Sequence, residues 1–490
     1  MAFAAEHPFI IPTVTSNEPV LDRHQAPVAE SFCLDREDDP WWASWKTAAD
    51  LLQHLQGLLD ADEDGTLAVR EADMPEPITG LMHYIGGETI VIPHRLLTES
   101  LDVGGGGLLE LIRSRHRPHL WVIDGTVRGG TLHSVLTSGD RERLGITSNL
   151  QRVKVPWRAV DLPPGRPGVL QAYEELTKGS RPDRRRSRAG KGVAWSGLTF
   201  MDEGPRRGER HRAWVFARTE RGSGKPPEVV GTQAWSRPVR QLRLRELRGL
   251  EHARGVVVGA GSVGGHVALE MARAGFGRLD IVDHDDYDLN NGVRHVLQAN
   301  EAGRSKAQAV AERAQASSPF TDAVGHDRDV GSSQEARRSV LEMVGAASVV
   351  IDATGSRNVT RLLHRRCAEA GVPLISGALS PGGRGARVLV LRGFRPCLDC
   401  FYSDASIPVP DSDPVANTTP YGCSHPAASC APFDVSELAS NIARCAVRCV
   451  PRLRYPRLDF DWAVMNFCRS ENRWAQGLLE PQADCVACTS

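Results

Sequence analysis

The stretch that decides the fold reads Val256-Val-Val-Gly-Ala-Gly-Ser-Val-Gly-Gly265. Its valines predict a buried strand, its glycines a tight turn, and the residues that follow a helix beginning near Val263. Glycines let backbone N–H groups approach a phosphate, and the helix N-terminus adds a favourable dipole. A second strand, expected over residues 278–283, ends in Asp283, which could bind ribose hydroxyls. The pattern predicts a nucleotide-binding α/β domain, and by itself fits a nicotinamide or a flavin site equally well.

Polar residues beyond this strand separate the alternatives. Asn291 and Arg294 lie close together in the chain, and Lys306 opens another expected helix. A hydride-transfer enzyme has no need of these groups. An enzyme that directs attack on the α-phosphate of ATP does, because charge grows on the phosphoryl oxygens and cations must already face them. We therefore interpret Arg294 and Lys306 as catalytic cations; the alternative is a surface loop of solvated charges.

The same run resembles the adenylating domain of the ThiF family, which ubiquitin-activating enzymes share with the bacterial sulfur-carrier activators of thiamin and molybdopterin synthesis. The family's strand-end aspartate, second aspartate, asparagine, arginine and following lysine are all matched. The resemblance implies an ATP site made of Gly259, Gly261, Gly264, Asp283, Asp285, Asn291, Arg294 and Lys306. It also implies that the partner is a β-grasp protein, ubiquitin-like or a sulfur carrier, whose terminal glycine is activated.

The next segment extends the domain. Residues 348–352 predict a buried strand, 358–370 a helix and 372–377 another strand. This alternation predicts a doubly wound, mostly parallel, Rossmann-like sheet in the C-terminal half, beside a smaller α+β N-terminal region. In the resembled family the turn after the first of these strands usually carries an aspartate associated with magnesium. Here Gly355 stands at that position and Asp352 is retained, so Asp352 joins the predicted cofactor site, and ATP chemistry implies Mg²⁺.

Four of the eleven cysteines form two Cys-x-x-Cys pairs, Cys397 with Cys400 and Cys485 with Cys488. Two such pairs can supply the four thiolates of a closed tetrahedral Zn²⁺ site. The resembled family places a zinc site in this way. The alternatives are disulfides or free core thiols, and since no secretion signal is visible, persistent disulfides are not expected.

Other cysteines are candidates for acyl transfer. Ubiquitin-activating enzymes carry their thioester cysteine on a mobile segment in the region between the two pairs. Cys423, in a Gly-Cys-Ser-His-Pro sequence, is the predicted nucleophile. Cys430 is the alternative, since it lies nearer the start of an expected helix, where a thiolate is stabilised. An inert loop cysteine is the other interpretation of Cys423.

The N-terminal region is similar in order to ubiquitin-conjugating enzymes: a histidine, a cysteine followed by Leu-Asp, tryptophans and a long helix from about Thr47. Cys33 would then be a second acyl acceptor, or a structural remnant, because His24-Gln-Ala replaces the family's His-Pro-Asn and only a short segment precedes the cysteine. We expect three parts: a conjugating-enzyme-like module, complete or truncated, over 1–73, a middle α+β or linker region over 74–240, and the adenylation domain with its zinc site over 241–490.

Composition limits the remaining functions. Lys and Arg number 59 against 60 Asp and Glu, so the basic run over residues 178–192 is expected to be a solvated linker and nucleic-acid binding is not expected. Neither a signal peptide nor a membrane-spanning run is visible, so we expect a cytoplasmic protein. We also expect it to form a homodimer. The predicted function is adenylation of a β-grasp protein followed by thioester transfer. The alternatives are a biosynthetic adenylyltransferase that acts on a sulfur carrier or peptide without conjugation, and an NAD-dependent oxidoreductase.

Overall fold

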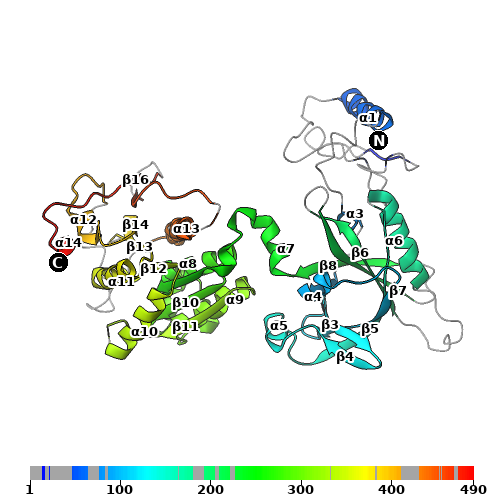
Figure 1. Cartoon of the computed structure of the whole chain (residues 1–490), viewed down its shortest axis with the longest axis horizontal. Coiled ribbons are helices and arrows are strands. Elements are labelled where there is room, and N and C mark those ends of the chain that lie inside the picture. The colour runs from blue at the N-terminus through cyan, green and yellow to red at the C-terminus, as the bar shows by residue number, and fades with distance from the viewer. Residues whose placement is uncertain are drawn as a thin grey trace. The chain divides into compact units, whose positions relative to one another are not determined.

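The computed structural model describes residues 14–16, 21, 32, 47–64, 77–82, 87–163, 165–179, 193–204, 209–220, 227–331, 333–380, 383–409, 430–451, 453, 455–467 and 473–489. The chain divides into two units, Met1–Val239 and Arg240–Ser490. Each unit has its own sheet and its own hydrophobic core (Figure 1).

The N-terminal unit is built mainly from strands. Its helices are α1 (Ala48–Glu63), α3 (Ile78–Leu81), α4 (His94–Thr98), α5 (Ser138–Arg143) and α6 (Gly165–Gly179), and α7 (Arg237–Gln241) follows at its end. Its strands are β1 (Thr89–Pro93), β2 (Gly106–Ser114), β3 (Leu120–Arg128), β4 (Thr131–Ser134), β5 (Leu150–Ala159), β6 (Val193–Glu203), β7 (Arg210–Glu220) and β8 (Glu228–Trp235).

These strands close into a barrel (Figure 1). The sheet has the order β1-β8-β7-β6-β5-β2-β3-β4, and β1 also pairs with β3, so the ring closes. Strand β4 lies outside the ring and pairs with β3 as an antiparallel hairpin. Alternating side chains of β2, β3, β5 and β7 fill the interior, including Trp121, Trp157 and Trp214. Closure removes the exposed edges that an open sheet of this kind would present.

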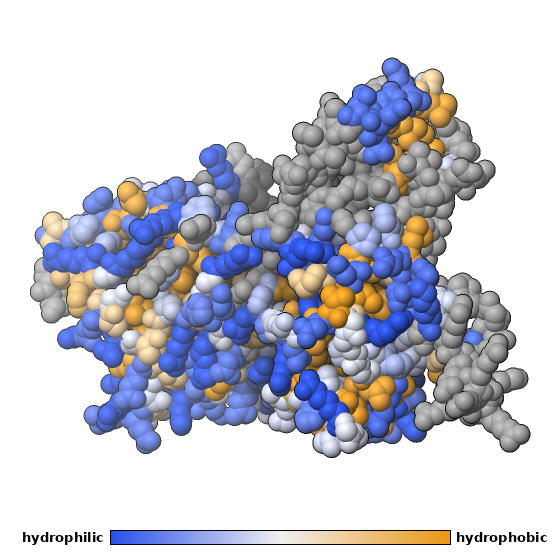
Figure 2. All heavy atoms as spheres, turned by 45° about the vertical axis from the view of Figure 1, so that its right-hand side comes forward, coloured by the Kyte–Doolittle hydropathy of each residue, from blue (hydrophilic) through white to orange (hydrophobic). Residues whose placement is uncertain are grey.

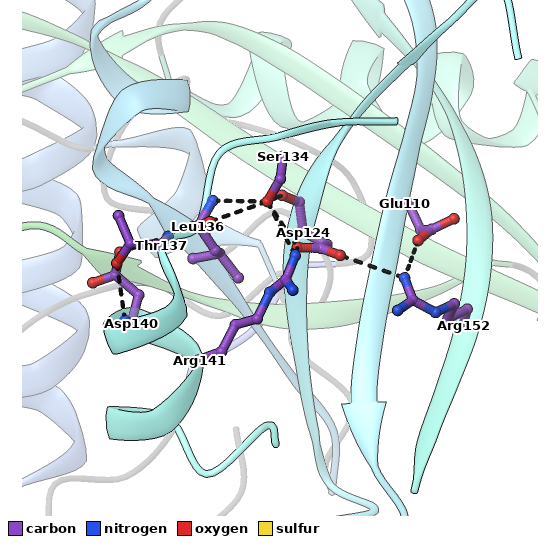
Figure 3. Close-up of polar contacts among 8 residues, drawn as sticks. All are labelled: Glu110, Asp124, Ser134, Leu136, Thr137, Asp140, Arg141 and Arg152. Atoms are coloured by element: carbon purple, nitrogen blue, oxygen red, sulfur yellow. Dashed lines mark hydrogen bonds and ion pairs between the residues drawn. The ribbon is translucent and has the colours of Figure 1, made fainter. Parts of the chain in front are cut away.

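A buried ion-pair cluster ties α5 to the outside of the barrel (Figure 3). The carboxylate of Asp124 on β3 is fully buried and accepts hydrogen bonds from Arg141 of α5 at 2.5 Å and from Arg152 of β5 at 3.5 Å. Ser134 of β4 donates to the same carboxylate at 3.1 Å, and Glu110 of β2 accepts a hydrogen bond from the same Arg152 nitrogen, Nη1, that donates to Asp124. Each buried charge here has a partner, as burial requires.

The C-terminal unit contains α8 (Ser262–Ala274), α9 (Lys306–Ser317), α10 (Gln334–Gly345), α11 (Arg357–Ala370), α12 (Leu398–Ser403), α13 (Pro432–Cys449) and α14 (Val486–Thr489). Its strands are β9 (Arg254–Val258), β10 (Arg278–Asp283), β11 (Asp322–Asp327), β12 (Val349–Asp352), β13 (Leu374–Leu379), β14 (Gly385–Leu391), β15 (Trp462–Asn466) and β16 (Ala475–Gly477). Short 3₁₀ helices η2 (Leu242–Leu247), η3 (Leu250–His252), η4 (Leu289–Val293) and η5 (Ala299–Glu301) complete the unit.

The sheet order is β11-β10-β9-β12-β13-β14-β15-β16, parallel from β11 to β13 and antiparallel beyond. Helices α8, α9 and α13 pack on one face, and α10, α11 and α12 pack on the other. The predicted doubly wound, mostly parallel sheet is confirmed. Chain order reverses between β9 and β12, and such a switch point is where open α/β sheets bind ligands.

The surface is more hydrophilic than the two cores. Figure 2 shows hydrophilic residues over much of the visible described face, with smaller apolar areas between them. Among the described residues, no helix combines the length and the apolar character that crossing a membrane requires.

Candidate nucleotide site and cysteine cluster

The glycine-rich turn lies at the switch point, between the end of β9 and the start of α8. Gly259 adopts a φ of +91°, and a Cβ there would lie 2.8 Å from the carbonyl carbon of Ala353, which follows β12. A Cβ on Gly264 would lie only 1.7 Å from the Gly259 carbonyl oxygen. At Gly261, by contrast, a Cβ would meet nothing within 4 Å. Two glycines are therefore required by the fold, while Gly261 leaves the backbone open to an approaching ligand.

Two side chains hold this turn from opposite sides. The Ala260 N–H donates to Asp283 at 2.6 Å, and a second oxygen of that carboxylate accepts from the Asp285 N–H at 2.8 Å. His295 lies 2.9 Å from the Ala260 carbonyl oxygen through Nε2, while its Nδ1 accepts from the Leu297 N–H at 3.1 Å. An Nδ1 acceptor leaves the proton on Nε2, so the ring is neutral and donates to the turn. Sequence analysis assigned no role to His295.

Burial maintains this neutral ring. His295 is 8% exposed, and burial, assisted by the charge of Lys306, lowers its pKa to about 4, while the hydrogen bond to the Ala260 carbonyl oxygen acts in the opposite direction with a smaller effect. The turn is consequently held by a neutral donor at ordinary pH, and protonation at Nδ1 would abolish the acceptor for Leu297.

The predicted cations converge on the same edge of the sheet. Lys306, the first residue of α9, is 9% exposed, and its ammonium group donates to Asp285 at 2.8 Å. Arg294 donates through Nε to Ser262 at 3.2 Å, which places its guanidinium beside the first turn of α8. Asn291 lies in η4, and its backbone carbonyl oxygen accepts a hydrogen bond from the backbone N–H of Arg294 at 3.1 Å. The structure thus brings the glycine turn, two aspartates and two cations together.

Asp352 lies at this edge too, but its carboxylate is already occupied. It is 1% exposed and accepts hydrogen bonds from the Thr354 N–H at 3.1 Å, the Thr354 hydroxyl at 2.7 Å, the Ser376 hydroxyl at 3.2 Å, and the Thr360 hydroxyl. These donors fix the turn after β12 against α11 and β13. The hydroxyl residues around Asp352 were missed in the sequence, because they come together only through the fold.

The candidate nucleophiles are unequally defined. Cys423 and Cys33 lie outside the described residues. Cys430 is half-buried just before α13, close enough to Arg294 for the guanidinium to favour its thiolate. Burial, assisted by Asp434, nevertheless raises the pKa of the Cys430 thiol to about 11. Helix α13 begins at Pro432, a favourable first position, and Asp434 lies in its first turn.

The two Cys-x-x-Cys pairs form one compact cluster. The sulfur of Cys397 lies 3.8 Å from that of Cys400 and 3.5 Å from that of Cys485, and the sulfurs of Cys400 and Cys488 are 3.5 Å apart. All four sulfurs lie within 4.8 Å of one another. In a tetrahedral zinc site with Zn–S bonds of about 2.3 Å, sulfur–sulfur edges are about 3.8 Å. The cluster has the donor set and the size of such a site.

A glycine turn, strand-end aspartates and cations meet at the switch point of this α/β sheet, and comparison with known proteins identifies the family of the domain. Residues 236–448 match the model of the ThiF family, so the C-terminal unit is a ThiF-family domain. The predicted resemblance to the ThiF family is confirmed over this part of the chain.

Several known proteins are similar to the chain. The uncharacterized protein y4oA of Sinorhizobium fredii is 22% identical over 99% of this chain and 88% of its own length. The sulfur carrier protein ThiS adenylyltransferase of Bacillus subtilis is 29% identical over 31% of this chain, and the SAMP-activating enzyme E1 of Haloferax volcanii 32% identical over 32%. The chain covers 44% and 57% of those two relatives. A crystal structure of E. coli MccB has 15% identity and a TM-score of 0.41, covering 52% of this chain and 73% of that one.

The glycine geometry yields a prediction about stability. Replacing Gly264 with alanine should destabilise the C-terminal unit by about 3 kcal/mol or more, because the new Cβ collides with backbone that cannot move aside. Gly261→Ala is the matched control and should change the free energy of unfolding by less than about 1 kcal/mol. Urea unfolding of the full chain, followed by circular dichroism, measures both; equal effects would contradict the assigned packing.

The buried histidine predicts a pH dependence. The folded-state pKa of His295, about 4, lies below the ordinary histidine value of 6.5, so the unfolded chain binds the proton first as pH falls. Stability that is fully present above pH 6.5 should therefore be lost progressively toward pH 4, by about 3 kcal/mol from this group. His295→Gln should reduce the slope of unfolding free energy against pH over this window. An unchanged slope in His295→Gln would contradict the assigned burial of this ring.

Proposed function

We propose that this chain uses ATP to adenylate the C-terminal carboxylate of a small β-grasp protein, ubiquitin-like or a sulfur carrier. The observation that carries the proposal is the convergence of Arg294 and Lys306 beside the open Gly261 turn of a ThiF-family domain. The named activities of the relatives, ThiS adenylyltransferase and SAMP-activating enzyme E1, support the same chemistry.

In the proposed complex the phosphates lie against the glycine turn and the start of α8, where backbone N–H groups and the helix dipole favour anions. A carboxylate oxygen of the partner attacks the α-phosphorus of ATP, the bond to the bridging oxygen breaks, and pyrophosphate leaves. Negative charge grows on the α-phosphate oxygens, and Arg294 and Lys306 would stabilise it. The product is a mixed anhydride of the partner's carboxyl group and AMP.

Each remaining residue has a role consistent with its contacts. Asp283 would reach the ribose hydroxyls while one oxygen holds the Ala260 N–H. Asn291 would bind phosphate or ribose from η4. Asp352, whose lone pairs are already occupied, would position the turn that carries Ala353. The carboxylates of Asp283 and Asp285 are hard oxygen donors that suit Mg²⁺, which would neutralise the leaving pyrophosphate.

We further propose that the cysteine cluster holds one zinc ion. Cys397 and Cys485 are 88 positions apart in the sequence, so the metal would fasten the C-terminal segment to α12. Zinc would have a structural role there and not a catalytic one, because a closed site with four thiolates leaves no position for substrate.

The proposal extends to a thioester. The acyl adenylate would pass to a cysteine, with release of AMP, and Cys423 is preferred because burial disfavours the thiolate of Cys430. Cys33 would accept the acyl group from that thioester. In the biosynthetic alternative, which the ThiS adenylyltransferase relative favours, neither cysteine is needed. Assembly as a homodimer in the cytoplasm belongs to the same proposal.

Adenylation is tested by ATP–pyrophosphate exchange with a glycine-terminated β-grasp protein from the same genome. Arg294→Ala and Lys306→Ala should each lower exchange by about 100-fold, which corresponds to about 3 kcal/mol of lost transition-state stabilisation. Arg273→Ala, which removes an exposed cation at the far end of α8, is the matched control. Exchange at the wild-type rate in a folded Lys306→Ala protein would refute the assignment.

Metal content is tested by elemental analysis of the purified chain. We expect one zinc per chain, and Cys400→Ser or Cys485→Ser should lose the metal and lower the thermal stability of the C-terminal unit, because zinc binding is coupled to folding. Cys430→Ser is the matched control and should keep its zinc. Active protein purified without zinc would defeat this part of the proposal.

The thiol step is tested on non-reducing gels. Cys423→Ala should keep pyrophosphate exchange and lose the thiol-sensitive adduct with the partner, because adenylation needs the cations and not the thiol. Cys33→Ala should trap the adduct on Cys423 and block only onward transfer. An adduct lost in Cys430→Ala but kept in Cys423→Ala would move the assignment to Cys430. Exchange with no adduct in the wild-type chain would support the biosynthetic alternative.

A further inference from the structure

A cavity lies at the edge of the C-terminal sheet opposite the nucleotide site. It has a volume of about 710 Å³, and its lining includes Pro373, directly before β13, and Gly393, shortly after β14. The nucleotide site lies at the carboxyl ends of the parallel strands, whereas β13 begins at the other edge of the sheet and the antiparallel β14 ends there. The volume is in the range of pockets that hold small organic molecules. The proposed adenylation does not use this cavity.

Three arginines line this cavity. Arg392 follows β14, Arg448 lies in the last turn of α13, and Arg457 lies in the segment after that helix. The described residues of the lining include no aspartate and no glutamate. In the sequence, residues 438–458 contain five arginines and no acidic residue. The cavity is therefore built into a basic part of the chain.

Two of these guanidinium groups have no counterion among the described residues. Arg392 donates a hydrogen bond to Asp461 at 2.7 Å. Arg448 has its Cζ 5.9 Å from the centroid of the Tyr455 ring. The side chains of Arg448 and Arg457 form no ion pair and no hydrogen bond with the part of the chain that the structure describes. Arg457 is exposed, and the side chain of Arg392 is 42% exposed, so a ligand in the cavity can reach both.

The charges around the cavity favour an anion. Asp461 compensates Arg392, which leaves the positive charges of the other two arginines. Gly371 and Val450, the residues that cap the ends of α11 and α13, also line the cavity, and each helix end carries about half a negative charge. Together the two ends offset one of the two positive charges. Asp459 is exposed, lies outside the lining and forms no ion pair with a described arginine. The remaining field is positive and attracts an anion.

We propose that this cavity binds a small organic molecule that carries a phosphate group. The planar guanidinium fork pairs with phosphate oxygens through two parallel hydrogen bonds. A phosphate monoester offers three such oxygens and up to two negative charges, so it can engage more of the arginines than a carboxylate can. Leu453 and Leu458, which are partly buried in the lining, would contact the organic part of the ligand. This binding activity is independent of adenylation.

The experiment titrates phenyl phosphate into the full chain labelled with 3-fluorotyrosine. The ¹⁹F signals of the six tyrosines are followed by NMR, and the signal of Tyr455, which lines the cavity, is identified by its absence in Tyr455→Phe. We expect that signal to shift in a saturable way. Dimethyl phenyl phosphate, which has the same shape and no charge, should cause no saturable shift. Benzoate should bind at least about threefold more weakly than phenyl phosphate, since it offers fewer oxygens and less charge. Equal affinities for the two anions would overturn the assignment of phosphate.

Variants assign the binding to the arginines. Arg448→Gln and Arg457→Gln should each weaken phenyl phosphate about tenfold, the effect of losing a hydrogen bond to a charged group. Arg444→Gln is the matched control, because Arg444 is exposed one turn earlier on α13 and does not line the cavity, and it should leave the affinity unchanged. Lys306→Ala, which removes a cation of the nucleotide site, should also leave the Tyr455 shift unchanged. If the Tyr455 signal does not shift up to the solubility limit, if Arg457→Gln binds as tightly as the wild type, or if the shift is lost in Lys306→Ala, the proposal fails.

Discussion

The Gly259 carbonyl oxygen occupies the space in which a side chain at position 264 would have to lie, and the nucleotide-binding edge depends on this close approach. Because α8 can start this near to β9, its first turn faces the space above the sheet. The same turn presses against Ala353, so the segment after β12 is positioned by it as well. A single steric constraint thereby aligns the carboxyl ends of two neighbouring strands.

Hydrogen bonds then convert that alignment into a site. Asp283 accepts a hydrogen bond from the Ala260 N–H, and His295 donates one to the Ala260 carbonyl oxygen. Both residues lie in segments that follow β9 in the chain. Lys306 is held by Asp285, and Arg294 by Ser262. In the proposed complex the cations would therefore be fixed before a phosphate arrives, which is the arrangement that stabilises developing charge with least reorganisation. His295 must be neutral to hold this arrangement, since a protonated ring could not accept a hydrogen bond from the Leu297 N–H.

The two units use their buried polar groups differently. In the C-terminal unit, Asp352 is saturated by hydroxyl and backbone donors, so it stiffens the edge of the sheet. In the N-terminal barrel, Asp124 joins strands and helix α5 through arginines. One buried carboxylate is therefore held mainly by hydroxyl and backbone donors, and the other mainly by guanidinium groups.

The sequence alone determined the parts of this protein that are governed by local patterns. A valine strand, the glycine spacing and a strand-end aspartate were sufficient to predict the β9–α8–β10 unit and the doubly wound sheet, because strand, turn and helix periodicities are local. The pairs of cysteines predicted a four-sulfur cluster because Cys-x-x-Cys spacing is itself a geometric motif. Arg294 and Lys306 were predicted as cations of the site from spacing that the ThiF family shares.

Tertiary structure decided what depends on contacts between distant segments. Closure of the barrel rests on the pairing of β1 with both β3 and β8, which no local pattern encodes. The grip of His295 on Ala260 joins residues 35 positions apart, and the Ser376 contact of Asp352 spans 24. The raised pKa of Cys430 comes from burial beside α13. Such contacts follow from how the elements pack, and packing is determined by the whole chain together.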